Sequence, residues 1–432
     1  YGTVAAEAGS TATGDAWPVH RGDNSRSAST GTQVPKDLTQ LWSNDMGGEL
    51  TAPVIAGRSV VVALKERHTV VSLDANDGTK QWSFTCGGRI DSPPTISGGW
   101  VVFGSHDGHV YCLRSSDGRL VWKYLAAFED KRTMAFGQLE SVWPVVGSVS
   151  VLDDTVYCVA GRSSYLDGGM VLRRLDLNTG AEKGKTVLYS RDPETGEQPD
   201  ELLEDVELPG ALPDILVFEG GSMFLRDKQF DLEGQEKPGQ YKRHLYSSAG
   251  LLDPDWWHRT TWIWGERSYG RAKGWAIAGK YNPSGRILAL DDTRVYGYKP
   301  RGHTRHWLFC SDKKVEKSKK KMRNSNAAIS KYVTPDKVIY HWKVGIDFAV
   351  RGMVKAAAHV IAAGPLGGVV AFDASAASTL AVFSAGDGKL LSKATLPCQP
   401  VFDGMAAADQ RVYMSLVDGQ VVCYGGRQRA RE

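Results

Sequence analysis

The 432-residue sequence lacks several features that would place it in a common class of protein. It has no run of eighteen apolar residues, so no membrane-spanning helix is predicted. Its formal net charge is only +3, so its overall field favours neither nucleic acid nor an anionic membrane. The GxSxG, HExxH and P-loop motifs are missing, as is a GxGxxG after a strand, which argues against the enzymes that these motifs mark.

The sequence is also poor in cysteine and has no CxxC pair, which argues against a zinc site. Cys112 and Cys423 occupy equivalent positions in two strand-like segments, where a small buried thiol fits well. We therefore interpret the cysteines as free structural thiols, while a disulfide between some other pair stays open. His303 and His306 have no carboxylate at a usual metal-ligand spacing, so no metal is predicted. The six cysteines are Cys86, Cys112, Cys158, Cys310, Cys398 and Cys423.

What the sequence does contain is an internal repeat. The segment from Ala52 to Phe84 recurs forty residues later, from Ser92 to Tyr124, with one Asp-Gly turn and one tryptophan in each copy. Trp82 of the first copy falls on Trp122 of the second. A period of this size is the signature of a β-propeller blade, and the 48 glycines supply the many turns that short strands need.

The number of blades follows from a hairpin pattern, in which a turn of Asp, Gly or Asn is followed by an apolar strand. We predict an all-β fold with a single propeller of seven four-stranded blades. Eight blades are the alternative, because residues 256–265 can form an extra short blade. The segment Leu38 to Ser43 is expected to supply the fourth strand of the last blade and so close the ring. The hairpin pattern occurs at residues 56–63, 96–104, 151–160, 217–225, 290–297, 357–364 and 408–415.

The domain prediction is a flexible leader at residues 1–16, the propeller at 17–425 and a polar tail at 426–432. Because the chain begins with Tyr1, we expect a processed protein or a piece of a longer precursor. The basic run from Lys313 to Arg323 is interpreted as a solvated loop, with contact to a polyanion as the alternative.

The repeat motifs SLDANDGTKQW and CLRSSDGRLVW resemble those of the pyrroloquinoline-quinone-type (PQQ-like) β-propeller family. The resemblance extends from Trp17 to Gly425. It is closest to bacterial chains described only by these repeats, through segments such as WPVHRGDNSRSAST and FGQLESVWPVVGS. More distant relatives are the quinoprotein dehydrogenases and the lipoprotein scaffold of the outer-membrane assembly machinery. The resemblance implies a propeller in the periplasm or outside the cell.

The quinoprotein dehydrogenases place a vicinal cysteine pair against their cofactor and bind calcium or a lanthanide beside it. No two cysteines are adjacent in this sequence. We therefore predict no cofactor, and binding of PQQ is not expected.

The repeat register also indicates which residues begin the innermost strands and so surround the central channel. Four of the seven are charged, which is more than burial alone favours. Either Asp–Arg salt bridges plug the channel, or the arginines line a polar pocket that binds a carboxylate or sulfate. The seven positions are Ala52, Ser92, Gly147, Asp214, Arg286, Arg351 and Asp403.

Loops that lead to this channel mouth add further candidate ligand-binding residues. The densest cluster is residues 255–259 (DWWHR), where two tryptophans can stack on a sugar ring or pack a corner between blades. His258 is the best general-base candidate because its ordinary pKa is near neutral, and Arg259 and Tyr165 are the other catalytic candidates. The loop candidates are Arg89, Asp91, Glu140, Trp143, Arg162, Asp167, Trp257, His258 and Arg259.

Two functions from different classes remain after these observations. The first is an extracytoplasmic binding or scaffold propeller that recognises a protein partner or a glycan without a redox cofactor. The alternative is an enzyme, a polysaccharide lyase acting on an acidic polysaccharide, in which arginine neutralises the uronate carboxylate while histidine or tyrosine moves the proton. A role in outer-membrane assembly is a third possibility. The oligomeric state is left open.

Overall fold

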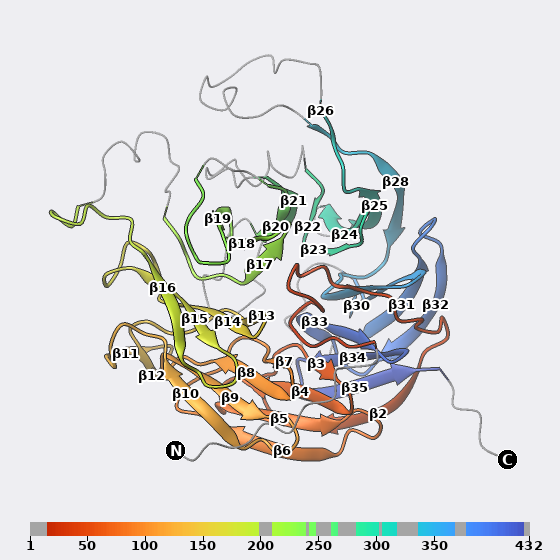
Figure 1. Cartoon of the computed structure of the whole chain (residues 1–432). Helices are drawn as coiled ribbons and strands as arrows, with labels where there is room; N and C mark the ends of the chain where they lie inside the picture. Colours follow the sequence, from red (N-terminus) through yellow and green to blue (C-terminus); the bar gives the residue numbers. More distant parts are fainter. Residues whose placement is uncertain are drawn as a thin grey trace.

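The computed structural model describes residues 15–197, 210–238, 242–247, 261–266, 282–301, 305–317, 336–367 and 377–426. Within these residues the protein is all β, and eight sheets are arranged as blades around a central channel (Figure 1). No helix in the described part is long and apolar enough to cross a membrane. The prediction of one all-β propeller is confirmed.

The strands of the blades follow the chain in order. Blade 1 has β3 (Val54–Ala56), β4 (Ser59–Leu64), β5 (Thr69–Asp74) and β6 (Lys80–Thr85). Blade 2 has β7 (Thr95–Ser97), β8 (Trp100–Gly104), β9 (His109–Arg114) and β10 (Leu120–Leu125). Blade 3 has β13 (Ser150–Leu152), β14 (Thr155–Ala160), β15 (Met170–Asp176) and β16 (Glu182–Leu188).

The next two blades have three described strands each. Blade 4 has β17 (Leu216–Glu219), β18 (Ser222–Leu225) and β19 (Lys228–Phe230). Blade 5 has β20 (His244–Ser247), β21 (Trp262–Gly265) and β22 (Ser284–Gly285).

The last three blades have four strands or more. Blade 6 has β23 (Ile287–Leu290), β24 (Arg294–Arg301), β25 (Arg305–Asp312) and β28 (Tyr340–Ile346). Blade 7 has β29 (Gly352–Ala356), β30 (His359–Pro365), β31 (Ser378–Ser384) and β32 (Leu390–Leu396), with β1 (Ser29–Thr30) parallel to β29. Blade 8 has β33 (Pro400–Ala408), β34 (Arg411–Leu416), β35 (Gln420–Gly425) and β2 (Thr39–Asp45).

Two short hairpins stand outside the blades. One pairs β11 (Arg132–Ala135) with β12 (Gln138–Ser141), and the other pairs β26 (Glu316–Lys317) with β27 (Asp336–Lys337). The basic run that begins at Lys313 lies mostly outside the described residues, as do the leader up to residue 14 and the tail from residue 427.

The main prediction of seven blades was wrong, and the alternative of eight is the one that the structure has. The additional blade is blade 5, whose central strand β21 lies in the segment 256–265 that suggested it. Between residues 244 and 285 the sequence has no Asp-Gly turn, so this blade lacks the repeat motif from which the blades were counted. Its strands are joined by long connections, which conceal the period.

The ring closes where the two ends of the propeller meet. Strand β2 pairs antiparallel with β35, and Trp42 lies opposite Cys423. The predicted closure by Leu38 to Ser43 is therefore confirmed. A blade that takes strands from both ends of the chain leaves no open edge between first and last blade.

A motif tryptophan packs on a motif glycine of the next blade at four of the blade junctions. Trp82 of β6 donates its indole N–H to the carbonyl oxygen of Ser115 in the next blade at 2.8 Å. Gly118 of that turn has a φ of 71°, and a Cβ added there would lie 2.6 Å from the Trp82 ring. Only glycine satisfies both conditions. The same contact joins Trp42 to Gly78, Trp122 to Gly180 and Trp342 to Gly388.

All six cysteines are free, and five of them are buried. Cys112 and Cys423 are fully buried on β9 and β35, the third strands of their blades. The interpretation of these residues as structural thiols is confirmed.

The chain before β2 closes one end of the channel. We call the end at which each blade's first strand begins the upper end, and the opposite end the lower end. Residues 15–32 contact the lower ends of first strands one after another, and this segment is the red trace near the centre of Figure 1. The amides that donate to its carbonyls belong to Ile55, Ile96, Phe218, Leu290, Lys355, Ala357 and Asp409.

Two arginines of this segment fill the channel from below. The Arg21 guanidinium donates to Asp403 at 2.5 Å, to the carbonyl of Arg26 at 2.9 Å and to the carbonyl of Leu288. Arg26 donates to the carbonyl of Leu216 at 3.0 Å and to the hydroxyl of Ser150 at 2.6 Å. Both side chains are almost completely buried, so the lower end of the channel is held by hydrogen bonds to four different blades.

Candidate functional site

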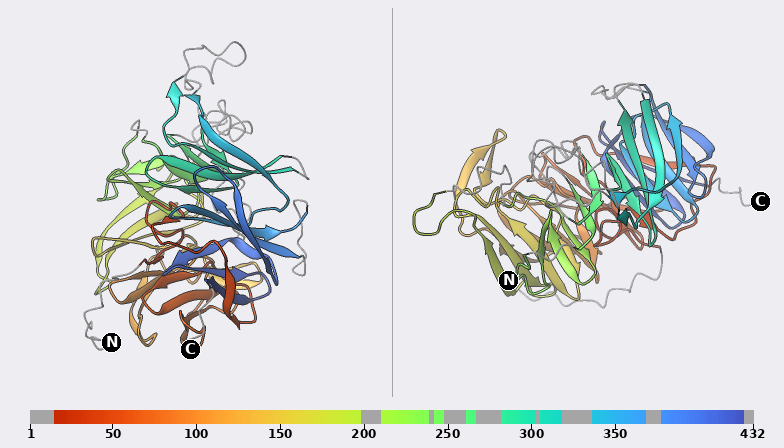
Figure 2. Two further views of the ribbon diagram at one scale, coloured as in Figure 1. Left: turned by 90° about the vertical axis from the view of Figure 1, so that its right-hand side faces the viewer. Right: turned by 90° about the horizontal axis from the view of Figure 1, so that it is seen from above.

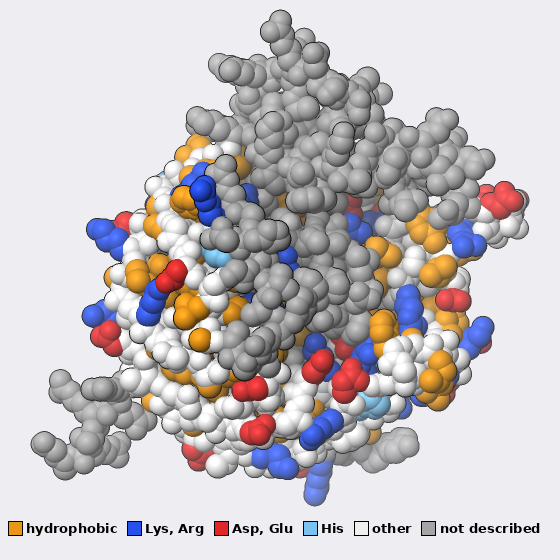
Figure 3. All heavy atoms as spheres, turned by 180° about the vertical axis from the view of Figure 1, so that it is seen from behind, with side chains coloured by type: hydrophobic (Ala, Val, Ile, Leu, Met, Phe, Trp, Pro, Cys, Tyr) orange, Lys and Arg blue, Asp and Glu red, His pale blue; other side chains and the backbone are white. Residues whose placement is uncertain are grey.

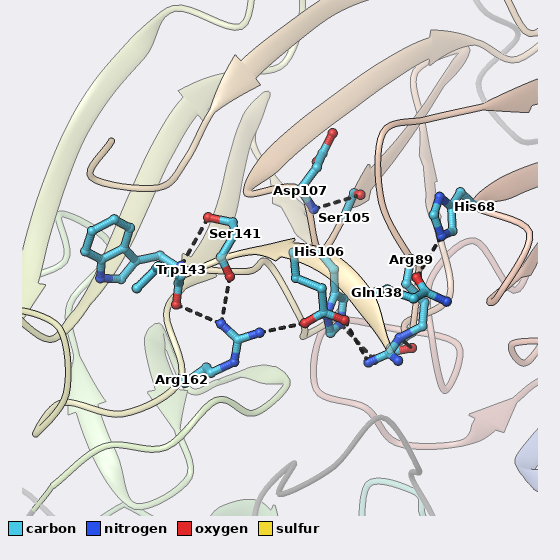
Figure 4. Close-up of polar contacts among 12 residues, drawn as sticks. His68, Arg89, Ser105, His106, Asp107, Gln138, Ser141, Trp143 and Arg162 are labelled. Atoms are coloured by element: carbon cyan, nitrogen blue, oxygen red, sulfur yellow. Dashed lines mark hydrogen bonds and ion pairs between the residues drawn. The ribbon is translucent and has the colours of Figure 1, made fainter. Parts of the chain in front are cut away.

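The upper face of blades 1 to 3 carries a buried network of charged side chains (Figure 4). Arg89 and Asp91 lie on the connection from blade 1 to blade 2, and His106 lies in the turn between β8 and β9. Glu140 is on β12, and Arg162 follows β14. In antiparallel blades these turns and connections come to the same end of the strands, and Figure 4 shows Arg162, His106 and Arg89 in a row.

The distances show that each carboxylate of the network faces more than one cation. His106 places Nε2 2.8 Å from Asp91 Oδ2 and Nδ1 3.1 Å from Glu140 Oε2. Arg89 Nε lies 3.0 Å from Asp91 Oδ1, and its Nη2 lies 3.4 Å from Glu140 Oε1. Arg162 Nη2 lies 2.6 Å from Glu140 Oε2.

These contacts fix the protonation states. Burial opposes the charge of His106, but the carboxylates of Asp91 and Glu140 outweigh burial and raise the pKa of the imidazole. Burial also opposes ionisation of Asp91, but His106 and Arg89 outweigh it and lower the pKa of that carboxyl. The raised pKa of His106 favours its imidazolium form, and the lowered pKa of Asp91 favours its carboxylate, so the two groups face each other as an ion pair.

Arg162 connects this network to the loops around it. Its Nη1 donates to the carbonyl oxygens of Ser141 at 2.7 Å and Val142 at 2.9 Å. Trp143 follows directly and donates its indole N–H to the carbonyl of Asp167 at 2.9 Å. Because Trp143 is buried, its ring is not presented for stacking on a sugar. The network thus holds three loops in one arrangement.

The candidates Arg89, Asp91, Glu140 and Arg162 are thus brought together, with Trp143 and Asp167 beside them. The ring of Tyr165 lies against Gly210, and burial raises the pKa of its hydroxyl. Trp257, His258 and Arg259 lie outside the described residues.

His106 was not among the predicted site residues. The forty-residue offset places it on Glu66, in the equivalent turn of blade 1. Glu66 Oε1 lies 3.7 Å from Arg89 Nη1, so the equivalent turn of blade 1 also reaches the network. A comparison of turn residues between the two copies is the signal that would have found His106.

The predicted channel positions form the upper mouth. Asp403 pairs with Arg21 from below, and Arg351 donates from Nε to the carbonyl of Pro400 at 2.9 Å. Asp214 accepts from the hydroxyl of Ser247 at 3.4 Å. The Arg286 guanidinium lies 5.9 Å from the ring of Phe402, and burial lowers the pKa of that guanidinium.

The other three positions are small residues at the same mouth. Ser92 donates its hydroxyl to the carbonyl of Val146. A Cβ added at Gly147 would lie 2.5 Å from the carbonyl oxygen of Asp214, so the neighbouring blade leaves no room for a side chain there. Ala52 lines a pocket of about 180 Å³ that also has Lys65, Asp91, Arg351 and Phe402 in its wall.

The hairpin β11–β12 stands next to the network and projects beyond the blades (Figure 2, right). Met134 and Leu139 are directly paired across it and are 69% and 55% exposed. Thr133, Gln138 and Glu140 lie on the opposite face beside Ala135, and Glu140 is buried in the network. A hairpin on a protein surface normally turns its apolar side inward. This one has the reverse polarity.

The tip of the hairpin is also unusual. Phe136 and Gly137 have φ angles of 50° and 72°, which is the two-residue turn that suits a hairpin. Phenylalanine is strained in this conformation, yet its ring is 54% exposed. The Arg89 guanidinium lies 4.8 Å from the ring, and His68 Nε2 lies 2.8 Å from Gln138 Oε1. The hairpin is thus fastened to the network at its base and tip.

The quinoprotein dehydrogenases bind a metal ion beside their quinone, so we asked whether the described site residues could bind a metal ion. No group of three or more His, Cys, Asp or Glu in the described ranges has the arrangement of a metal site. Asp91 and Glu140 already face two cations or more, so they do not fit as ligands of a further cation.

Comparison with known proteins agrees with the fold. Residues 35–198 match the family described as outer membrane protein assembly factor BamB. The predicted resemblance to the PQQ-like propeller repeat is confirmed. No curated protein matches the sequence.

Solved structures match over nearly the whole chain. The quinohemoprotein alcohol dehydrogenase of Comamonas testosteroni is 14% identical, with a TM-score of 0.57, and the match covers 99% of this chain and 84% of that one. A europium-containing methanol dehydrogenase is 10% identical, with a TM-score of 0.57, and the match covers 95% of this chain and 98% of that one. At these identities the matches establish the fold and leave the activity open.

Proposed function

We propose that this protein is a binding propeller that holds a protein partner on its upper face, outside the cytoplasm and without a redox cofactor. The observation that carries the proposal is the reversed polarity of the hairpin β11–β12, which presents Met134 and Leu139 to solvent. Exposed apolar side chains that are held in one place are typical of protein-binding surfaces.

Two further exposed apolar side chains are connected through Trp143 to the base of the hairpin. Phe128 is 37% exposed, and its ring meets Trp143 edge to face at 5.4 Å. Leu166 is 50% exposed and precedes Asp167, whose carbonyl accepts from Trp143. We call Phe128, Met134, Phe136, Leu139 and Leu166 the apolar tip surface. Elsewhere, as in the rear view of Figure 3, Lys and Arg are interspersed with Asp and Glu, which suits a specific contact better than binding to a polyanion.

The charge network supports binding over catalysis. A general base must be able to accept a proton, and the Asp91 and Glu140 carboxylates are held in ion pairs with Arg89, His106 and Arg162. The same pairs make the base of the hairpin rigid, so less conformational entropy is lost when a partner docks. The extracytoplasmic location rests on the family match to an outer-membrane assembly factor.

Site-specific photo-crosslinking tests the proposal. A photoreactive amino acid at position 134 or 139, in the protein expressed in its native cell, is expected to give one discrete crosslinked protein. The same group at position 390, an exposed leucine of β32 in blade 7, serves as the control and is expected to give none. The crosslinked protein is then identified, purified and shown to bind the wild-type propeller. Equal crosslinking from all three positions contradicts the proposal.

The cofactor part of the proposal has its own test. Titration of the purified protein with PQQ and calcium is expected to give no saturable change in tryptophan fluorescence and no dye reduction with alcohols. Saturable binding together with alcohol-dependent dye reduction contradicts it.

A further inference from the structure

We infer that the protein partner is held by strand addition, in which an extended segment of the partner pairs with the outer edge of β11 as a third strand of the hairpin sheet. This inference rests on the proposed function and deepens it, because it states what kind of segment the upper face recognises. The apolar tip surface would supply the side-chain contacts, and the edge of β11 the main-chain hydrogen bonds.

The register of the hairpin shows which main-chain groups of β11 point outward. At the base of the hairpin, Val142 donates its N–H to the carbonyl of Lys131 at 3.0 Å. In an antiparallel pair, residues that bond to the opposite strand alternate with residues whose N–H and C=O point away from it. The residues next in the alternation are Arg132 and Met134, so both point their N–H and C=O outward.

The outer edge of β12 shows the same alternation, but there the protein itself uses the outward groups. Ser141 lies opposite Arg132 and donates its N–H to the carbonyl of His106 at 2.7 Å. The carbonyl of Ser141 accepts from Arg162 Nη1 at 2.7 Å, as Figure 4 shows. Blades 2 and 3 thus cover the base of this edge, which confirms the register and leaves β11 as the open side.

The edge of β11 is free to pair. Among the residues that the structure describes, β11 pairs with β12 alone, and no hydrogen bond uses the N–H or C=O of Arg132 or Met134. Residues 132–134 are exposed, and the hairpin projects beyond the blades, so the edge is open to solvent (Figure 2, right). The strand has no proline and no bulge, two devices that commonly prevent pairing at an exposed edge.

The two faces of the hairpin specify the side chains of the added strand. Met134 and Leu139 lie side by side on one face, and a third strand continues that face. Side chains directly opposite in neighbouring strands contact each other, so the residues of the segment on this face are apolar. The residues between them lie on the face of Thr133 and are polar. Since β11 has four residues, a segment of similar length is enough.

The charges favour a different protein over a second copy of this chain. Pairing of β11 with β11 of another copy would bring Lys131 and Arg132 of both copies into one short ladder, where like charges repel. Arg132 is paired with Asp130 at 3.1 Å, whereas Lys131 is exposed and has no ion pair among the described residues. The occupant is thus a partner segment of alternating apolar and polar residues, with an acidic residue at the end near Lys131.

Hydrogen exchange at single residues tests the inference. The probe is the protein identified by crosslinking from positions 134 and 139, purified and added to the wild-type propeller. The amides of Arg132 and Met134 are expected to exchange rapidly in the free propeller and at least about tenfold more slowly in the complex. The amide of Thr133, which bonds within the hairpin, is the internal control and is protected before the partner is added. Unchanged exchange at Arg132 and Met134 in the complex overturns the inference.

A pair of variants at one position tests the main-chain bond by affinity. Arg132→Pro removes the outward N–H and keeps the bonds within the hairpin, since proline is tolerated on an edge strand where its nitrogen faces solvent. Arg132→Ala removes the same side chain and keeps the N–H. The proline variant is expected to bind the crosslinked protein about tenfold more weakly than the alanine variant. Urea denaturation checks that both are folded, and hydrogen exchange decides the question if the proline variant is not.

The outcomes separate this inference from the proposed function. Equal affinities of the two folded variants overturn strand addition and leave the apolar tip surface as the contact. A crosslink between two copies of this chain overturns the choice of occupant. Failure to crosslink any protein from positions 134 and 139 overturns both the proposed function and the inference.

Discussion

The two ends of the channel use buried arginines in different ways. At the lower end, Arg21 and Arg26 donate mostly to backbone carbonyls, which belong partly to the N-terminal segment itself and partly to blades 4 and 6. At the upper end, Arg89 and Arg162 face the carboxylates of Asp91 and Glu140. A backbone carbonyl is available at every residue, so the lower contacts do not require particular side chains in the blades. They hold the N-terminal segment in the closed ring. The upper contacts depend on chosen acidic residues and position particular loops.

The largest effect is expected at the lower end. Arg21→Met removes the cation beside buried Asp403 and leaves that carboxylate unpaired, which typically costs about 3–5 kcal/mol of the free energy of unfolding. Urea denaturation of the purified protein measures the loss. Arg119→Met, at an exposed position, is the control and is expected to change stability by less than about 0.5 kcal/mol. A loss below about 1 kcal/mol for Arg21→Met would contradict a structural role for the segment.

The second effect depends on pH and belongs to the upper end. Since the folded protein raises the pKa of His106, this group contributes stability below its ordinary pKa of about 6.5, and the contribution disappears as pH rises through the raised value. The stability difference between wild type and His106→Gln should therefore be larger at pH 6 than at pH 9. Urea unfolding at both pH values measures it.

The control for this experiment is His359→Gln in blade 7, at a histidine that contacts the carbonyl of Val34. No carboxylate pairs with that ring among the described contacts, so this variant measures the cost of losing a partly buried histidine that lacks such a partner. A pH-independent cost for His106→Gln would mean that His106 is not held as an imidazolium.

The third prediction concerns the hairpin β11–β12 and distinguishes an effect on partner binding from an effect on the stability of the fold. The double change Met134→Glu with Leu139→Lys, called the charged hairpin variant, removes the apolar pair and replaces it with opposite charges that suit a cross-strand pair. We expect partner affinity to fall at least about tenfold, while the free energy of unfolding changes by less than about 1 kcal/mol. Binding by the crosslinked partner and urea denaturation are measured on the same preparation. A large loss of stability would mean that the hairpin supports the fold.

The smallest effect is expected at the hairpin tip. Phe136→Asn replaces a strained residue with one that tolerates a positive φ, which relieves about 1–2 kcal/mol. The lost contact of the ring with Arg89 offsets about 0.5–1 kcal/mol of this gain. Thermal unfolding should therefore show an unchanged or slightly raised midpoint. A clear decrease would indicate that Phe136 packs in a way that its exposure does not suggest.

Much of the ring could be predicted from the sequence because its contacts repeat. Trp82 and Gly118 come from copies of one motif, so the forty-residue period reports the interblade contact directly. The closing strand around Trp42 followed from the same motif. Blade 5 was missing from the predicted count of seven because the sequence between its strands has no Asp-Gly turn.

The channel and the upper face were less predictable because their contacts join residues that are distant in sequence. The register placed Asp403 at the channel, but its partner Arg21 is 382 residues away and belongs to no repeat. Arg89, Asp91, Glu140 and Arg162 were found as candidates from their loops. The imidazolium of His106 that joins them depends on burial between two carboxylates, which no local pattern reports.

The central claim is that the upper face holds a protein partner through the apolar tip surface. It is tested most directly by the dissociation constant of the purified, crosslinked partner for three proteins: wild type, the charged hairpin variant, and Leu390→Glu on blade 7. We predict that the charged hairpin variant binds at least about tenfold more weakly and that Leu390→Glu binds like wild type. Equal dissociation constants for wild type and the charged hairpin variant, with both proteins fully folded, would contradict the claim.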